Sequence, residues 1–162
     1  MLDALRRQHS VSLPRVRQAL EYLREALRAK HPLTDPSLQT DGLDLFVERY
    51  GTLINATQAG QTAMREMLRA HLQRIERNPA GAPVRLYPFT RKHDLEEPRV
   101  VMMDPQIQYG RPVLVDSGIP TAIIAERYKA GESIRELAAD YGREPQDIEE
   151  AIRCELRLAD AA

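Results

Sequence analysis

The spacing of apolar residues predicts an amphipathic helix near the start of the chain. Its apolar face recurs at intervals of four, three and four residues: Val16, Leu20, Leu23 and Leu27. This is the period of one side of a helix. Ser12 is a favourable N-cap, and Pro14 falls in the first turn, where its missing N–H costs nothing. With a short helix expected over residues 2–9, the pattern outlines a helix-turn-helix unit.

An alternating pattern comes next and predicts a β-hairpin over about residues 43–55. Leu43, Leu45 and Val47 occupy every second position, as on one face of a strand. Tyr50-Gly51 reads as the turn, and residues 52–55 read as the returning strand. A hairpin after a basic helix is typical of a winged helix-turn-helix, although it could equally be a packing device.

The middle of the chain predicts a further helix over residues 61–77 and an edge strand over 84–89, which Pro88 keeps short. The polar residues 90–98 read as a linker. We therefore expect two domains. Residues 1–92 form a basic helical domain with a β-hairpin, winged-helix-like, and residues 98–162 form a small helix-turn-helix domain.

Two short apolar runs, residues 100–103 and 111–115, predict an antiparallel ribbon in the second domain. A two-stranded ribbon is marginal in water without cover. The cover comes either from helices or from the ribbon of a second subunit, and we expect a homodimer.

Three helices are predicted after the ribbon. Ile119 and Pro120 begin the first. Ser133 caps the second, because Glu136 three residues later completes a capping box. Gly142 supplies a turn to the third helix, which begins near Asp147. The fold class is therefore mainly α with short β-hairpins (α+β), and the last two helices have helix-turn-helix spacing.

Charge separates the two domains. Residues 1–30 carry seven Lys or Arg against three acids, whereas residues 93–162 carry eight against fifteen. The last helix holds three Arg against five acids between Arg143 and Arg157, which suits contact with phosphates poorly. It better suits a protein-facing or dimerising surface, although Gln146 and Arg153 could read bases in principle. The candidate DNA contacts lie instead on the first basic helix, at Arg15, Arg17, Arg24 and Arg28.

Candidate catalytic chemistry is sparse. The four His are scattered without metal-ligand spacing, and no glycine-rich phosphate loop or HExxH motif occurs. We expect neither an enzyme nor a metal or cofactor. The single Cys, Cys154, rules out an intrachain disulfide and suits a reducing compartment. No apolar run approaches the length of a membrane span, so a cytoplasmic location is expected.

The C-terminal part resembles the domain of unknown function family 433. The resemblance is carried by GRPVLVDSGIP, AGESIRELAADYG and DIEEAIRCE. The usual Gly-Thr-Arg of the family is Asp116-Ser117-Gly118 here. The matching residues are Gly110, Arg111, Pro112, Val113, Ile119, Pro120, Ala130, Gly131, Ser133, Ile134, Asp140, Tyr141, Ile148 and Ala151. Of the residues that could face a toxin or a second subunit, we select Gly110, Arg111, Pro112, Ile119, Pro120, Ser133, Ala138, Gly142, Ile148 and Arg153.

The resemblance implies the antitoxin of a VapBC-like type II toxin–antitoxin pair. Such an antitoxin binds and neutralises a toxin that resembles a PIN-domain ribonuclease, and it often represses its own operon. Longer VapB-like members begin with a further helix-turn-helix, which this chain is expected to lack. The alternative is a stand-alone DNA-binding transcriptional regulator that uses the basic helix over residues 12–30 and the hairpin over residues 43–55.

Overall fold

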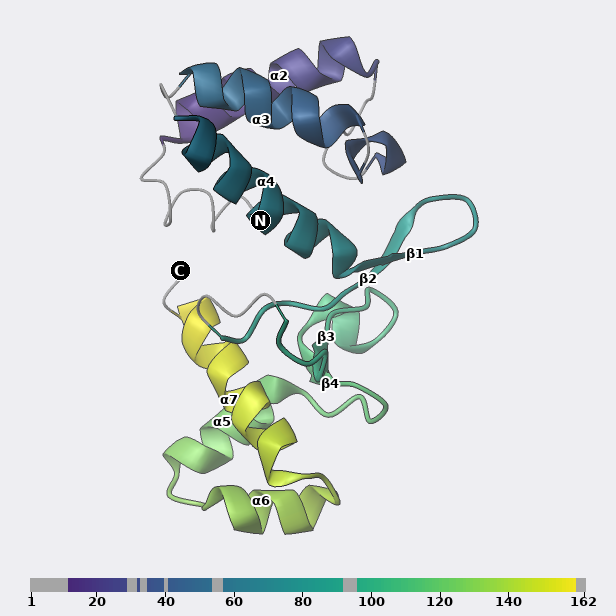
Figure 1. Ribbon diagram of the computed structural model, residues 1–162. Helices are drawn as coiled ribbons and strands as arrows, with labels where there is room; N and C mark the ends of the chain where they lie inside the picture. Colours follow the sequence, from purple (N-terminus) through teal and green to yellow (C-terminus); the bar gives the residue numbers. More distant parts are fainter. Residues whose placement is uncertain are drawn as a thin grey trace. The chain divides into compact units, whose positions relative to one another are not determined.

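The computed structural model describes residues 12–28, 32, 35–39, 41–53, 57–91 and 96–159. These residues contain six α-helices and two short two-stranded sheets (Figure 1). The predicted fold class, mainly α with short strands, is confirmed. The chain divides into two compact units, Met1–Pro83 and Val84–Ala162. The helix expected over residues 2–9 lies outside the described residues.

Helix α2, Leu13–Ala26, is the predicted basic helix. Ser12 takes the extended N-cap conformation, but its side chain makes no capping hydrogen bond. Its carbonyl oxygen accepts from the amides of Arg15 and Val16 instead. The buried side of α2 consists of Val16, Ala19 and Leu23, which agrees with the predicted apolar face.

The predicted hairpin at 43–55 is wrong, because residues Asp41–Leu53 form helix α3. Leu43, Phe46, Val47 and Tyr50 are all buried, and their spacing is that of one helical face. Gly51 makes no turn. It is buried within α3, and a Cβ there would lie 2.7 Å from the Gln61 side chain. The glycine therefore allows a close contact between helices, and the described residues contain no wing at this position.

Helix α4, Gln58–Gln73, begins at Thr57, whose hydroxyl accepts from the amide of Gly60 at 3.1 Å. It ends before the predicted residue 77, because Ile75–Arg77 is strand β1. Strand β1 pairs with β2, Pro83–Leu86. Asn78 closes the turn between them, because its backbone amide donates a hydrogen bond to the carbonyl oxygen of Ala82 at 2.9 Å.

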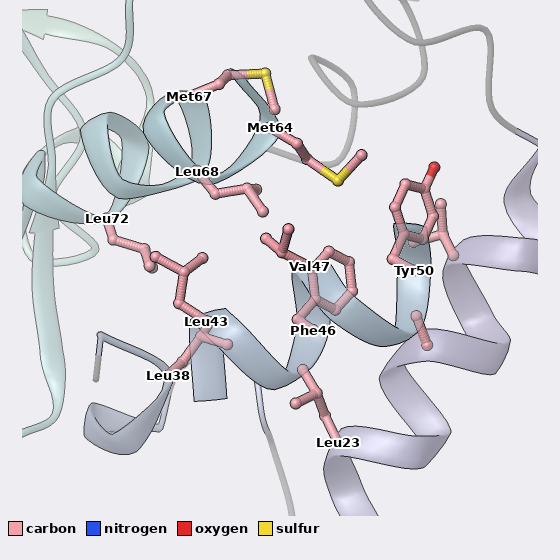
Figure 2. Close-up of a cluster of buried hydrophobic side chains, with 12 residues drawn as sticks. Leu23, Leu38, Leu43, Phe46, Val47, Tyr50, Met64, Met67, Leu68 and Leu72 are labelled. Atoms are coloured by element: carbon pink, nitrogen blue, oxygen red, sulfur yellow. The ribbon is translucent and has the colours of Figure 1, made fainter. Parts of the chain in front are cut away.

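The core of the first unit is formed where α2, α3 and α4 meet (Figure 2). Phe46 and Tyr50 stack with ring centroids 5.4 Å apart, and Met64 packs in the same cluster. The buried members are Val16, Ala19, Leu23, Leu38, Leu43, Phe46, Val47, Tyr50, Met64, Met67, Leu68 and Leu72. Leu38 comes from the short 3-10 helix η1, Pro36–Gln39.

The second unit is built on strands β3, Val101–Met102, and β4, Val113–Leu114. They pair antiparallel, with Val101 opposite Leu114 and Met102 opposite Val113, so the predicted ribbon is confirmed. Helix α7, Pro145–Ala159, contacts both strands of this same unit. The ribbon is thus covered without a second subunit, and the homodimer stays a prediction.

Helices α5, Thr121–Lys129, and α6, Ile134–Tyr141, complete the unit. Both pack against α7. The shared core contains Val101, Leu114, Ile124, Leu137, Ala138, Ile148, Ala151, Ile152 and Cys154. The three predicted C-terminal helices are all present.

The stretch predicted as a linker, residues 90–98, contains buried residues. Thr90 and Glu97 are buried, and Thr90 is hydrogen-bonded to Glu150 of α7. The division between the units lies between Pro83 and Val84, before this stretch. The predicted domains, residues 1–92 and 98–162, stay a prediction.

Candidate functional site

The C-terminal helices are held in place by the capping interactions that the sequence predicts. The amide of Ser133 donates to Glu136 Oε2 at 2.8 Å, and the amide of Glu136 donates to Ser133 Oγ at 3.3 Å. The Ser133 hydroxyl also donates to Glu136 Oε2, at 2.7 Å, and this hydrogen bond together with that from the Ser133 amide holds the pKa of the Glu136 carboxyl below its ordinary value. Gly142 ends α6 with a φ of 61°, a left-handed conformation that glycine adopts without strain. The amide of Arg143 then bonds Ala138 O at 2.9 Å.

A closed turn carries most of the remaining predicted residues. The amide of Leu114 donates to Ile119 O at 2.9 Å, and that of Thr121 donates to Pro112 O at 3.0 Å. Val113 and Pro120 form a bridge across the turn. Pro112, Ile119 and Pro120 therefore bring β4 to the start of α5, while Gly110 and Arg111 precede β4.

Glu150 is the centre of a charge cluster in this unit. Its side chain is 1% exposed. Arg91 donates to Glu150 Oε1 from Nε at 2.8 Å and from Nη2 at 2.6 Å. Arg153 donates to the same oxygen at 2.6 Å, and the Thr90 hydroxyl donates to Oε2. Although burial raises the pKa of this carboxyl, the hydrogen bonds from Thr90 and Arg91 and the charge of Arg91 outweigh it, so the pKa is lowered.

The two arginines of α7 are both engaged by this cluster and its surroundings. Arg153 also pairs with Glu149 at 3.0 Å. Arg157 donates to the carbonyl oxygens of Phe89 at 3.1 Å and Arg91 at 2.6 Å. Because both cations already bind groups of their own unit, α7 is poorly equipped to neutralise phosphates, and the absence of DNA contact by this helix stays a prediction.

Arg127 joins α5 to α6. It donates to Glu132 Oε1 at 2.8 Å and to Asp140 Oδ2 at 2.7 Å. Its guanidinium carbon lies 5.0 Å from the centre of the Tyr141 ring. The hydrogen bond from Arg127 lowers the pKa of the Glu132 carboxyl. This exposed network fixes the turn in which Gly131 and the capping residue Ser133 lie.

Two loops with left-handed backbone lie next to one another at the ribbon. Gln108, Tyr109 and Gly110 have φ values of 48°, 56° and 78°. The Tyr109 side chain is 98% exposed. Asp116 and Gly118 have φ values of 59° and 66°. A Cβ on Gly118 would lie 3.9 Å from Ile107 Cγ2, so the second loop rests against the first.

An open hollow of about 370 Å³ lies beside these loops. Its apolar lining includes Met102, Ile107 and Val115, and its polar lining includes Arg85, Asp116 and Ser117. Arg85 bonds Asp104 Oδ2 at 3.3 Å. Asp116 is exposed, and within the described part of the chain it forms no ion pair.

The candidate DNA contacts of the first unit are all at the surface. Arg15, Arg17 and Arg24 lie on exposed positions of α2, and Arg28 follows the helix with a φ of 49°. Among the described residues none of the four forms an ion pair. Their accessibility meets one requirement for phosphate contact, and their role stays a prediction.

Sequence reasoning missed Glu150, Arg91, Thr90 and Tyr109. Thr90 and Arg91 contact Glu150 although about sixty residues of sequence separate them from it. Local sequence patterns give no information on contacts at this separation. A usable signal was the place of Glu150 between Ile148, Ala151 and Ile152 on the buried face of α7. An acid there needs a partner.

Neither a metal site nor a membrane span emerges from the described ranges. They hold no group of three or more His, Cys, Asp or Glu side chains that could bind a metal ion. None of their helices combines the length and apolarity that crossing a membrane requires.

Comparison with known proteins confirms the family resemblance of the C-terminal part. Residues 101–153 match the family described as "Protein of unknown function (DUF433)". Along 94% of its length it is 30% identical to a Mycobacterium tuberculosis protein named "Putative antitoxin VapB45". The chain spans 66% of the length of that relative, just under two thirds.

The fold also has a counterpart among solved structures. The crystal structure of Rv2018 from Mycobacterium tuberculosis matches with a TM-score of 0.62 at 23% identity. The match covers 91% of this chain and 72% of that one. It supports the fold described above.

Proposed function

We propose that this chain is the antitoxin of a type II toxin–antitoxin pair, which binds and neutralises a PIN-like ribonuclease and represses its own operon. The likeness to a VapB-type relative along nearly the whole chain carries the proposal. In this proposal the chain is a regulatory binding protein without catalysis and acts in the cytoplasm as a homodimer.

Charge supports a protein partner for the second unit. The last 79 residues, Val84–Ala162, hold eleven Lys or Arg against fifteen acids. A ribonuclease needs a basic surface to bind the phosphates of RNA. An acidic unit whose α7 arginines are already paired complements such a surface better than it complements nucleic acid.

A nuclease assay tests this proposal. The product of the neighbouring gene, the expected toxin, is titrated with the purified full chain, and RNA cleavage is followed. Cleavage should fall to background near one binding equivalent. The same chain after heat unfolding serves as the control. Undiminished RNA cleavage at saturating amounts of the folded chain would refute the proposed antitoxin function.

The second candidate is DNA binding by α2, with or without a toxin. The exposed positions of Arg15, Arg17, Arg24 and Arg28 favour it. A fragment of the chain's own promoter should bind at about 50 mM salt and weaken as salt rises. The double substitution Arg15→Ala/Arg17→Ala should lower the salt slope by about two, since each phosphate contact contributes about 0.9.

The matched control for DNA binding lies in the second unit. Arg135→Ala removes an exposed arginine from α6 and should leave the promoter affinity unchanged. If the wild-type chain does not bind the fragment at about 50 mM salt, DNA binding by α2 is excluded.

A further inference from the structure

The loop around Tyr109 combines exposure with backbone strain. A tyrosine that is 98% exposed gains nothing from burial in its own chain. Its φ of 56°, next to a Gln108 φ of 48°, places two adjacent non-glycine residues in a region that disfavours side chains. The turn is closed by backbone hydrogen bonds from Gly110 N to Ile107 O at 3.0 Å and from Arg111 N to Gln108 O at 3.1 Å. Among the described residues the Tyr109 side chain makes no hydrogen bond or ring contact that would favour this conformation, and residues with such a strained backbone cluster where a partner is bound.

The neighbouring turn supplies an unpaired charge. Asp116 also has a positive φ, at 59°, and its side chain is exposed. It borders the hollow of about 370 Å³ whose apolar lining includes Met102, Ile107 and Val115. Asp104, the other nearby acid, is already bound to Arg85 and to the amide of Gln106. Asp116 is therefore the carboxylate available to an incoming cation.

From these features we infer that the hollow and the Tyr109 loop form the docking surface for the nuclease partner, which inserts a basic side chain. The alkyl stem of an arginine or lysine would lie over the apolar lining, and its charged end would meet Asp116. Tyr109 would supply the exposed aromatic anchor that binding hot spots favour. This surface is named the Tyr109–Asp116 face, and the inference rests on the proposed function.

Charge decides between a protein and a nucleic acid as the occupant. Phosphates would be repelled by Asp116 and by the excess of acids in this unit. A basic protein segment would be attracted by the same negative charges. Arg85, the cation that lines the hollow, is bound to Asp104 and is therefore already neutralised within the chain.

Binding measurements with four variants of the full chain test the face. The probe is the PIN-like ribonuclease whose inhibition defines the proposed function. Tyr109→Ala and Asp116→Arg should each weaken the affinity about tenfold or more. Tyr128→Ala and Glu126→Arg make the same chemical changes at exposed positions of α5 and should stay within about twofold.

A stability control separates binding from folding. Tyr109→Asn removes the ring but suits a left-handed backbone. Its thermal midpoint should equal or exceed that of the wild-type chain while the nuclease affinity falls as in Tyr109→Ala. A lower midpoint with unchanged affinity would contradict both the strain argument and the docking role.

The outcomes distinguish the inference from the proposed function. If the wild-type chain does not bind the nuclease, both fail. If it binds and all four variants bind equally well, the proposed function stands and the Tyr109–Asp116 face is excluded. If Tyr109→Ala or Asp116→Arg instead changes promoter binding alone, the face serves DNA and the inference is overturned.

Discussion

Replacing Glu150 is the sharpest test of how the second unit is held together. Its carboxylate is 1% exposed and receives hydrogen bonds from Thr90, Arg91 and Arg153. Glu150→Gln keeps the size of the side chain but removes the charge and turns one acceptor into a donor. Hydrogen bonds to charged groups contribute about 1.5–3 kcal/mol each.

The expected loss is smaller than the sum of these contacts. Arg91 and Arg153 are 38% and 43% exposed, so water solvates both guanidinium groups once Glu150 is gone. We therefore expect Glu150→Gln to lower the free energy of unfolding by about 2 kcal/mol, rather than the roughly 3–5 kcal/mol of a fully buried broken pair.

Glu149→Gln is the matched control. Glu149 lies one residue away and pairs with the same Arg153 at 3.0 Å, but it is 39% exposed. An exposed pair four residues apart on a helix contributes about 0.3–0.5 kcal/mol. Native-state hydrogen exchange of the α7 amides reports on this unit alone. If the two variants lower α7 protection equally, the buried cluster does not stabilise the unit.

The pH dependence of the same variant follows from the lowered pKa of Glu150. A carboxyl whose pKa is depressed on folding stabilises the protein above its unfolded pKa. This contribution is lost as the pH falls through the folded value. The difference between wild type and Glu150→Gln should be constant from pH 6 to 8 and should shrink below the ordinary value of 4.5. A difference that grows on acidification would refute the assignment.

Three further substitutions or measurements test single features. Tyr50→Phe should leave the stability unchanged or raise it by about 1 kcal/mol, because the buried hydroxyl has no hydrogen-bond partner among the described residues; a loss above about 1 kcal/mol in urea denaturation would reveal a hidden partner. Gly142→Ala should lower the free energy of unfolding by about 1 kcal/mol and Gly142→Asn by less, because φ is 61°. A Cβ at this position would meet nothing within 4 Å, so the loss comes from the backbone conformation alone. Equal thermal midpoints for both variants and the wild type would contradict the left-handed cap. Burial raises the pKa of Cys154 to about 12, so a thiol reagent at pH 8 should label it only after unfolding, and rapid labelling of the native chain would show that α7 opens.

The C-terminal helices could be predicted because their signals are local. Ser133 and Glu136 lie three residues apart, as a capping box requires, and Gly142 ends the helix by its own backbone freedom. The ribbon could be predicted for a similar reason, because two short apolar runs flank a turn.

The prediction failed at α3 because one sequence fits two periods. Leu43, Leu45 and Val47 alternate as in a strand, while Leu43, Phe46, Val47 and Tyr50 follow a helical face. Packing against α2 and α4 decides for the helix. Gly51 reads as a turn locally, yet it is a point of close helix contact in the fold.

The candidate site was predictable only in part. The motif residues Pro112, Ile119 and Pro120 do meet in one turn. The Glu150 cluster depends on Thr90 and Arg91, far away in sequence. The left-handed conformation of Tyr109 carries no sequence signature, because a tyrosine is an uncommon residue there.

The central claim is that the chain neutralises a nuclease by direct binding. The direct test is to titrate the product of the neighbouring gene, the expected toxin, with the purified full chain while RNA cleavage is followed. With the nuclease well above the dissociation constant of the complex, cleavage should fall to background near one binding equivalent. With the nuclease below that constant, Tyr109→Ala should need about tenfold more protein for half-inhibition. Cleavage that persists at saturating amounts of the wild-type chain would refute neutralisation by direct binding.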